Sequence, residues 1–288
     1  MGAMIKFPVG EEQGGMRLRE FLRRKCGVSA SLLTKLKRTE HGVEINGAHA
    51  RSVDRVNAGD LVTITLPDDE NDIPPVDIPV NVLLEDEHII VFDKPPFLTV
   101  HPVHGHQGDT LANAASFYAM QKGEHYSFRA INRLDRDTSG VLLAAKNSYA
   151  AALLPNSASK VYEGVCEGIV TKGGTVDAPI RIKAGHTIER ETGEGGVPAV
   201  THYEPVASGC GHTLLRFALE TGRTHQIRVH MASLGHPLAG DDMYGGKLTF
   251  IDRQALHCSE VSFIHPVTGE SVTVRSPLPA GFLKLIGK

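Results

Sequence analysis

The sequence feature that most constrains the fold is a polar turn that runs directly into a short apolar segment. The turn, residues 132–140, interleaves acidic and basic side chains, namely Arg133, Asp135, Arg136 and Asp137. Residues 141–145 are all apolar, and Lys146 ends the run. A short apolar run bounded by glycine and polar residues predicts a buried strand. Because charge near a core is costly unless it is paired or used, we expect the turn at a sheet edge or cleft.

Several known kinds of polar turn can be compared with this one. The ordinary explanation is a solvated turn whose charges neutralise one another. Asp135, Asp137 and Ser139 resemble the first half of a calcium loop, but the twelfth position, which requires an acid, is Lys146. Residues 137–140 resemble the aspartic-protease signature, which lacks the extra residue before glycine and occurs twice. The chain has no second copy, so neither calcium nor protease chemistry is predicted.

Length and composition place the chain among ordinary globular proteins. Its 288 residues suggest about two domains. It has no run of about 18 apolar residues and no signal-peptide segment at its start, so we expect a soluble, cytoplasmic protein without membrane contact. The four cysteines are scattered, which predicts reduced thiols and no zinc site. The net charge of −3 argues against a uniformly basic nucleic-acid binder.

Positive charge is nevertheless concentrated near the N-terminus. Residues 16–66 hold ten lysines and arginines against five acids. Apolar spacing predicts a short helix from Leu18, a second helix capped by Ser29, a hairpin turn at Asn46-Gly47 and a strand at residues 61–66. Cations gathered on one side of such a unit predict a phosphate-contacting surface, with a merely solvated basic face as the alternative. The candidate RNA-binding residues here are Arg17, Arg19, Lys35, Lys37 and Arg38.

The charge reverses after this segment. Nine acids fall between residues 68 and 93, with no lysine or arginine before Lys94. Such a composition shift, interrupted by prolines, predicts a linker that RNA would repel. We therefore expect a small domain at residues 1–70, a linker at 71–80 that acts as a spacer, and a second domain at 81–288.

The second domain opens with a hairpin and a histidine-containing loop. Residues 83–94 predict strands that end at a pair of prolines. His101, His104 and His106 follow. Three histidines can bind a metal, but this loop contains glycine, no cysteine and only Asp109 nearby, so exposed side chains are the better explanation. We expect no bound metal.

The region after the central turn predicts a short helix capped by Asn147 and then a strand that begins at Lys160 and runs to Val170. Tyr162 lies in that strand, where a tyrosine is usually a packing residue. Residues 181–197 are polar and end in a glycine-rich run without apolar periodicity, which predicts a mobile loop.

A strand at residues 213–220 leads to the last candidate segment. Thr224 is placed to cap a helix over residues 225–234, which Gly235 would end. In that helix Ile227, Met231 and Leu234 are expected to face the core, with Arg228 beside them. A basic helix start can also be simply solvated.

Four segments together resemble one enzyme family. Asn132-Arg133-Leu134-Asp135-x-x-Thr138-Ser139-Gly140 is similar to the signature of the RluA family of pseudouridine synthases, which usually begins with histidine. The hairpin at residues 83–94, Lys160-x-Tyr162, and Thr221 to His230 with the Gly240-Asp241 that follows resemble the family's other motifs. Residues 16–66 look like the small RNA-binding domain of ribosomal protein S-four. In place of the short helix at Asn147 the family usually has a longer, charged one.

The resemblance implies a fold and a set of residue roles. It implies an α+β catalytic domain built on a mixed, largely antiparallel sheet, beside a small N-terminal α/β RNA-binding domain. It implies that Asp135 is the catalytic nucleophile, that Tyr162 lies against the target uracil, and that Arg228 pairs with the catalytic aspartate. For charged residues in the matched motifs it implies RNA contacts, and these are Arg133, Lys160, Arg223 and His225. Asn132 is expected to tune activity without abolishing it.

The chemistry of uridine isomerisation suits these residues. It needs a carboxylate kept ionised in a closed pocket, which an adjacent guanidinium favours, and an aromatic ring to replace stacking lost by the extruded base. It needs no redox cofactor, metal or energy source. We expect a monomer that acts on RNA, with large-subunit ribosomal RNA favoured by the S-four-like segment and transfer RNA as the alternative. The other readings are a non-catalytic RNA-binding or ribosome-assembly factor and an unrelated acid-dependent hydrolase.

Overall fold

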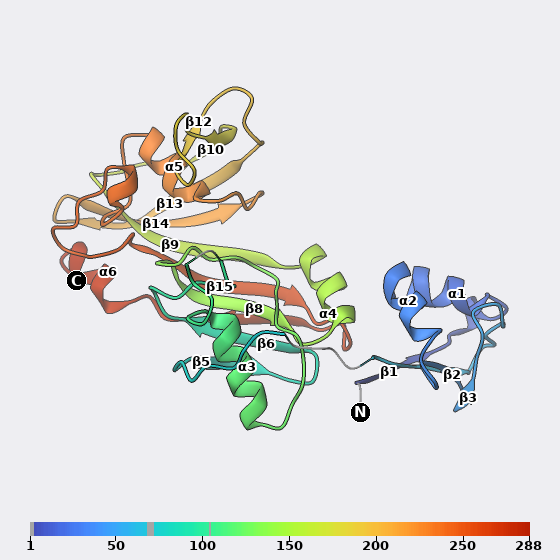
Figure 1. Cartoon of the computed structure of the whole chain (residues 1–288). Helices are drawn as coiled ribbons and strands as arrows, with labels where there is room; N and C mark the ends of the chain where they lie inside the picture. The colour runs from blue at the N-terminus through green and yellow to red at the C-terminus, as the bar shows by residue number, and fades with distance from the viewer. Residues whose placement is uncertain (1–2, 68–71, 104) are drawn as a thin grey trace.

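The structure, a computed structural model, describes residues 3–67, 72–103 and 105–288. It holds two main sheets, each with a core of its own (Figure 1). The N-terminal sheet has four antiparallel strands in the order β1-β4-β2-β3. Its elements are β1 Met4–Pro8, α1 Leu18–Glu20 with a π-helical turn Phe21–Lys25, α2 Ala30–Leu36, β2 Val43–Ile45, β3 Ala48–His49 and β4 Leu61–Thr65.

Local sequence explains this small unit well. Ser29 caps α2, because its hydroxyl accepts a hydrogen bond of 3.1 Å from the Leu32 amide. Asn46 and Gly47 both have positive φ, at 53° and 80°, as a two-residue hairpin turn requires. The helices cover one face of the sheet with apolar side chains such as Leu22 and Leu36. The basic side chains are left exposed.

The second sheet has ten strands, in the order β10-β13-β14-β9-β15-β8-β6-β5, with β16 on β15 and β7 on β8. They are β5 Asn81–Glu85, β6 Ile89–Lys94, β7 Arg129–Ala130, β8 Ser139–Ala145, β9 Ser159–Glu167, β10 Gly174–Asp177, β13 Val200–Gly209, β14 His212–Leu219, β15 Leu256–Ile264 and β16 Ser271–Arg275. In this described sheet β8 and β15 pair in parallel and the other pairs are antiparallel. The expected α+β class with a mixed, largely antiparallel sheet is confirmed.

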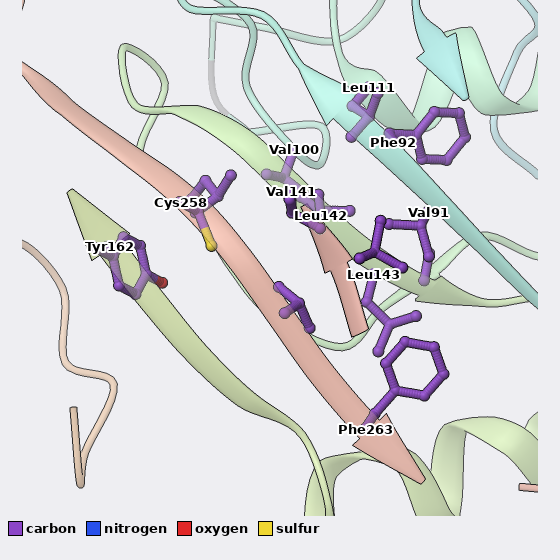
Figure 2. Close-up of a cluster of buried hydrophobic side chains, with 14 of the residues drawn as sticks. Val91, Phe92, Val100, Leu111, Val141, Leu142, Leu143, Tyr162, Cys258 and Phe263 are labelled. Carbon is purple, nitrogen blue, oxygen red and sulfur yellow. The ribbon is translucent and has the colours of Figure 1, made fainter. Parts of the chain in front are cut away.

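Strand β8 lies in the middle of the main core. Every residue from Ser139 to Ala145 is buried, as the apolar run predicted. Gly140 has a φ of 110°, and a Cβ there would collide with the carbonyl oxygen of Cys258 on β15. Glycine is therefore required where the parallel pair begins. Figure 2 shows the packing of Val141, Leu142 and Leu143 with neighbouring apolar side chains.

Four helices accompany the large sheet. They are α3 Leu111–Gln121, α4 Ser148–Leu153, α5 Gln226–Ser233 and α6 Ala280–Leu285. Leu111 and Ala115 of α3 pack into the main core. The α5 helix lies near β13 and β14 at one end of the sheet, and α4 lies at the other end beside the small domain (Figure 1). No helix within the described ranges is long and apolar enough to cross a membrane.

The short helix α4 links the two parts of the molecule. Asn147 caps it, as expected, because its side-chain oxygen accepts from the Ala150 amide at 2.9 Å. Tyr149 is buried in the core of the small domain, where its hydroxyl donates to the Cys26 carbonyl at 2.7 Å. Leu153 packs on the same core. One helix of the larger domain therefore completes the core of the smaller one.

The second part of the expected linker lies on the large domain. Ile73, Ile78 and Val80 pack against the main core. The Asn113 side chain of α3 donates to the Pro74 carbonyl at 2.9 Å. The proposed boundary between residues 70 and 71 lies outside the described residues, as do the three acids at 68–70.

The expectation of a mobile loop at residues 181–197 is wrong, because much of this segment is ordered as a hairpin. It contains β11 Ile180–Ile182 paired with β12 Arg190–Thr192. Arg181 and Glu191 face each other across the pair, with Nε and Oε1 2.9 Å apart. This exposed cross-strand ion pair adds to the burial of Ile180, which packs with Ala199 and Val229. Strand β9 also ends at Glu167, three residues earlier than expected, because Gly168 turns away with a φ of 84°.

Candidate active site

The central turn is fixed to the start of β8. The Asn132 side chain donates to the Val141 carbonyl at 3.0 Å and accepts from the Leu143 amide at 2.8 Å. The Asp135 carbonyl accepts from the Thr138 amide at 3.1 Å. On one side of the turn, the Asn132 side chain makes the hydrogen bonds to β8 that a neighbouring strand would make. On the other side, the turn presents the Asp135 side chain. That side chain is 27% exposed, so the carboxylate is accessible at the edge of the core.

Two buried cations hold the turn from behind. The Lys94 ammonium donates to the Leu98 carbonyl at 2.7 Å and to the Arg136 carbonyl at 2.9 Å. The Arg253 guanidinium donates to the Asp137 carbonyl at 3.0 Å. Burial lowers the pKa of Lys94 to about 7 and also lowers the pKa of Arg253. Sequence reasoning missed both roles, although Lys94 ends the predicted hairpin just before its prolines.

Arg228 reaches Asp135 but has a closer partner. Its Nη1 lies 3.5 Å from Asp135 Oδ2. Its Nε and Nη2 each donate a 2.7 Å hydrogen bond to the buried carboxylate of Asp241. Burial opposes the charge of Arg228, but the hydrogen bonds and charge of Asp241 outweigh it and raise the pKa of the guanidinium. Sequence reasoning missed Asp241, whose signal was its place in the Gly240-Asp241 match.

Tyr162 lies on β9 between Phe217 of β14 and Cys258 of β15. Figure 2 shows its ring beside Cys258. Its side chain is buried, and burial raises the pKa of the phenol well above its usual value. The ring is therefore an apolar, uncharged wall at the base of the site.

The three side chains that the sequence singled out meet at one cavity. Asp135, Tyr162 and Arg228 line it together with Arg133 and Arg223. Its volume of about 50 Å³ admits no more than a few water molecules. A pyrimidine ring needs more room, so the cavity must widen when it takes one.

The start of helix α5 differs from the expectation. Thr224 is not the N-cap, and α5 begins at Gln226 with His225 as the residue before it, in the left-handed region at a φ of 57°. In the described chain no side chain caps α5; the Gln226 side-chain oxygen instead accepts from the Arg223 amide at 2.9 Å and fixes the turn that precedes the helix. The Thr224 hydroxyl instead accepts from Arg133 at 3.0 Å. Ile227 and Met231 are buried as expected, but Leu234 is exposed, because the helix ends before that residue.

His225 lines the same cavity. Its Nδ1 lies 2.8 Å from the Tyr244 hydroxyl, and its Nε2 lies 4.0 Å from Asp135 Oδ2. Burial lowers the pKa of the imidazole, so the ring is neutral near pH 7. The sequence suggested RNA contact for this residue, and the structure places it beside the carboxylate. Tyr244 was missed, although it lies only three residues after the Gly240-Asp241 match.

The remaining predicted RNA-binding residues fall into two groups. Arg133 and Arg223 are exposed at the rim of the cavity, and Lys160 is half-buried at the start of β9. The other five lie on the small domain, are exposed, and have no carboxylate within 4 Å in the described part of the chain; these are Arg17, Arg19, Lys35, Lys37 and Arg38. Their contact with RNA stays a prediction.

The histidine loop gives no sign of a metal site in what the structure describes. His106 lies 2.5 Å from Asp109, and His101 packs against Phe128. His104 lies outside the described residues. Among the residues at 3–67, 72–103 and 105–288 no three potential ligands cluster as a metal would need.

Comparisons with known proteins agree with this site. Residues 88–233 match the family model described as RNA pseudouridylate synthase. The chain is 38% identical over 270 residues to an uncharacterized RNA pseudouridine synthase of Bacillus subtilis, YjbO, covering 91% of this chain and 95% of the relative. It is 38% identical to ribosomal large subunit pseudouridine synthase D of Pseudomonas aeruginosa, covering 84% and 82%.

A solved structure agrees as well. The human RNA pseudouridylate synthase domain containing 1 superposes with a TM-score of 0.56 at 25% identity, covering 73% of this chain and 90% of that one. The family model spans half of the chain and the curated relatives span nearly all of it. The chain belongs to the RNA pseudouridylate synthase family.

Proposed function

We propose that the chain converts uridine to pseudouridine in RNA with Asp135 as the nucleophile. In this isomerisation the bond from ribose C1′ to N1 of uracil breaks and a bond from C1′ to C5 forms. The hydrogen on C5 leaves and N1 gains one, so nothing is consumed. The observation that carries the proposal is the meeting of Asp135, Tyr162 and Arg228 at one cavity.

Each of the three side chains has a part in this reaction. Asp135 acts on the sugar or the base as a carboxylate, and Arg228 Nη1 lies 3.5 Å from its Oδ2. Tyr162 offers a flat apolar face that replaces the stacking of the extruded uracil, worth roughly 1–3 kcal/mol. Covalent attack and the glycal route place the same demand on the carboxylate, because both need it unprotonated beside the ribose.

The substrate we propose is large-subunit ribosomal RNA. The ribosomal large subunit pseudouridine synthase D of Pseudomonas aeruginosa is one of several relatives whose name states such a target. The small domain supports the same choice, because its exposed cations suit contacts with the phosphates of a large structured RNA. We propose that residues 1–70 form this RNA-binding domain, and that the enzyme works as a monomer in the cytoplasm, where ribosomal RNA is modified.

The proposal is tested by replacing Asp135 with alanine and measuring tritium release from RNA that carries 5-tritiated uridine. Release reports loss of the C5 hydrogen. Asp135→Ala is expected to bind RNA as the wild type does and to release no tritium. Asp242→Asn, an exposed carboxylate outside the cavity, is the matched control and keeps full release. Tritium release by folded Asp135→Ala would refute the assignment, and mapping the pseudouridines lost on gene deletion identifies the target RNA.

A further inference from the structure

Two N–H groups near Asp135, one from Arg228 and one from His225, approach the same carboxylate oxygen. Arg228 Nη1 lies 3.5 Å from Oδ2, and His225 Nε2 lies 4.0 Å from it. Among the described residues no hydrogen bond reaches the other carboxylate oxygen, Oδ1. A carboxylate held through one oxygen presents the other one to a reactant. Oδ2 of Asp135 therefore faces both donors, and Oδ1 has no hydrogen bond within the described chain.

The imidazole of His225 is held in one tautomer by Tyr244. The Tyr244 oxygen accepts a hydrogen bond of 2.9 Å from the Arg190 amide of β12. The proton of the phenol is then available to His225 Nδ1 at 2.8 Å. Burial raises the pKa of Tyr244, so the phenol keeps that proton. A neutral imidazole carries one N–H, and with Nδ1 accepting, that N–H is on Nε2.

The backbone at His225 is also constrained. Its φ of 57° is uncommon for a residue other than glycine and is tolerated only when the surroundings enforce it. The ring lies edge-on to Tyr244 with centroids 5.7 Å apart. These restraints aim the Nε2–H of His225 into the cavity beside Asp135.

Two residues close in the sequence, Asp241 and Tyr244, hold the two neighbours of the Asp135 carboxylate. Asp241 holds Arg228 through two hydrogen bonds of 2.7 Å. Tyr244, three residues later, holds His225 and lies beneath the Arg228 guanidinium at 4.9 Å. Asp241 and Tyr244 therefore set the direction from which both donors approach Oδ2.

We propose that His225 is a positioning residue whose Nε2–H donates a hydrogen bond to Asp135 Oδ2 when RNA is bound, and that Tyr244 acts through it. Asp135 Oδ1 is then the reacting oxygen. This inference rests on the proposed function, since it names the residues that orient the nucleophile. It requires only that His225 Nε2 and Asp135 Oδ2 approach by about 1 Å, from the present 4.0 Å to an ordinary hydrogen-bond distance of about 3 Å.

The test is a double-mutant cycle between Tyr244→Phe and His225→Gln. Tyr244→Phe keeps the ring under Arg228 and removes only the hydroxyl. His225→Gln keeps an N–H near the place of Nε2 but has no acceptor at the place of Nδ1, where Tyr244 donates. Loss of one hydrogen bond to a carboxylate is expected to lower kcat about tenfold, with KM for RNA unchanged. Tyr244→Phe should show this fall in the wild type and no further fall in His225→Gln.

Two more variants complete the design. His225→Asn tolerates the left-handed backbone but is too short to reach Asp135, so it should lose at least tenfold in kcat, which His225→Gln partly restores. Tyr118→Phe is the matched control, because it also loses a phenol hydrogen bond, 2.8 Å to Glu85, but on α3 away from the cavity. It keeps full activity.

The outcomes separate this inference from the proposed function. Additive losses in the double variant, or unchanged kcat in Tyr244→Phe, would overturn the role of Tyr244. Equal activity of His225→Asn and wild type would overturn the role of His225. Absence of pseudouridine even with the wild type would instead count against the proposed function, and unfolding curves of each variant show whether a loss reflects stability.

Discussion

The Arg228 guanidinium is bound more tightly to Asp241 than to Asp135. It donates two 2.7 Å hydrogen bonds to Asp241 and approaches Asp135 at 3.5 Å. Asp241 is fully buried, whereas Asp135 is partly exposed. Asp241 is therefore the structural partner that fixes the guanidinium. Asp135 receives the remaining N–H group and keeps its freedom to engage a substrate.

Replacing Asp241 should weaken both the fold and catalysis. Asp241→Asn leaves the buried Arg228 without its counter-charge, and losing one partner of a buried pair costs about 3–5 kcal/mol. The freed guanidinium would turn toward Asp135 and tie up the carboxylate, so kcat should fall as well. Urea unfolding and tritium release measure the two effects, with the exposed neighbour Asp242→Asn as control. Wild-type stability and kcat in Asp241→Asn would show that Arg228 does not depend on this pair.

Much of the fold was predictable because its signals are local. Alternating and continuous apolar runs predicted β4, β8 and β14, and turn residues predicted the hairpin at Asn46-Gly47. The catalytic candidates were found because they lie in compact motifs. Asp135 and Arg228 are 93 residues apart, and no local pattern brings them together. Their meeting was predicted only by resemblance to a family.

What sequence reasoning missed depends on tertiary contacts. Asp241 was noted only as part of the Gly240-Asp241 match, and its role appears only when Arg228 of the preceding helix folds against it. The N-cap at Thr224 was a sound local expectation, but the Thr224 hydroxyl accepts from Arg133, and Gln226 fixes the preceding turn by bonding the Arg223 amide and the Thr221 hydroxyl. The hairpin β11–β12 was missed because only Ile180 among its strand residues is fully buried, so the segment shows no apolar period.

Asn132 should matter more for stability than for chemistry. Its buried side chain pairs with the Val141 carbonyl and the Leu143 amide, so Asn132→Ala leaves both groups without a partner. Each loss costs about 1–3 kcal/mol. Asn132→His, which restores the family's usual residue, should keep one of the bonds and stay within tenfold of wild-type kcat. Chemical denaturation checks the first effect and tritium release the second, with exposed Asn156→Ala as control. A lost kcat in stable Asn132→His would assign the position a direct catalytic part.

Lys94 should make stability depend on pH above neutrality. Burial lowers its pKa from 10.5 to about 7 in the folded chain. Between these values the unfolded chain holds a proton that the folded chain does not, so the free energy of unfolding rises with pH by about 1.4 kcal/mol per unit. Below pH 7 both states are protonated, and the contribution is constant.

The comparison that isolates this effect is wild type against Lys94→Met. The difference in their free energies of unfolding should be flat below pH 7 and grow toward pH 10. Lys172→Met, which removes an exposed lysine, is the control for loss of one charge. A difference that stays constant over the whole range would mean that the carbonyls of Pro95, Leu98 and Arg136 keep the ammonium protonated.

The basic face of the small domain should set the salt dependence of RNA binding. Deleting residues 1–70 is a poor test, because it would expose Tyr149 and Leu153, which that domain covers. Charge removal on α2 and just after it avoids this problem, since Lys35, Lys37 and Arg38 are exposed there.

Each of Lys35→Ala, Lys37→Ala and Arg38→Ala should weaken RNA binding and lower the slope of log K against log salt by about one, because a phosphate contact releases counterions. Lys284→Ala, exposed on α6 at the far end of the molecule, should change neither quantity (Figure 1). kcat at saturating RNA should stay constant, because the cavity at Asp135 is untouched. If none of the three substitutions changes the slope, the basic face of the small domain is merely solvated. The RNA contacts would then be made by the rim residues Arg133 and Arg223.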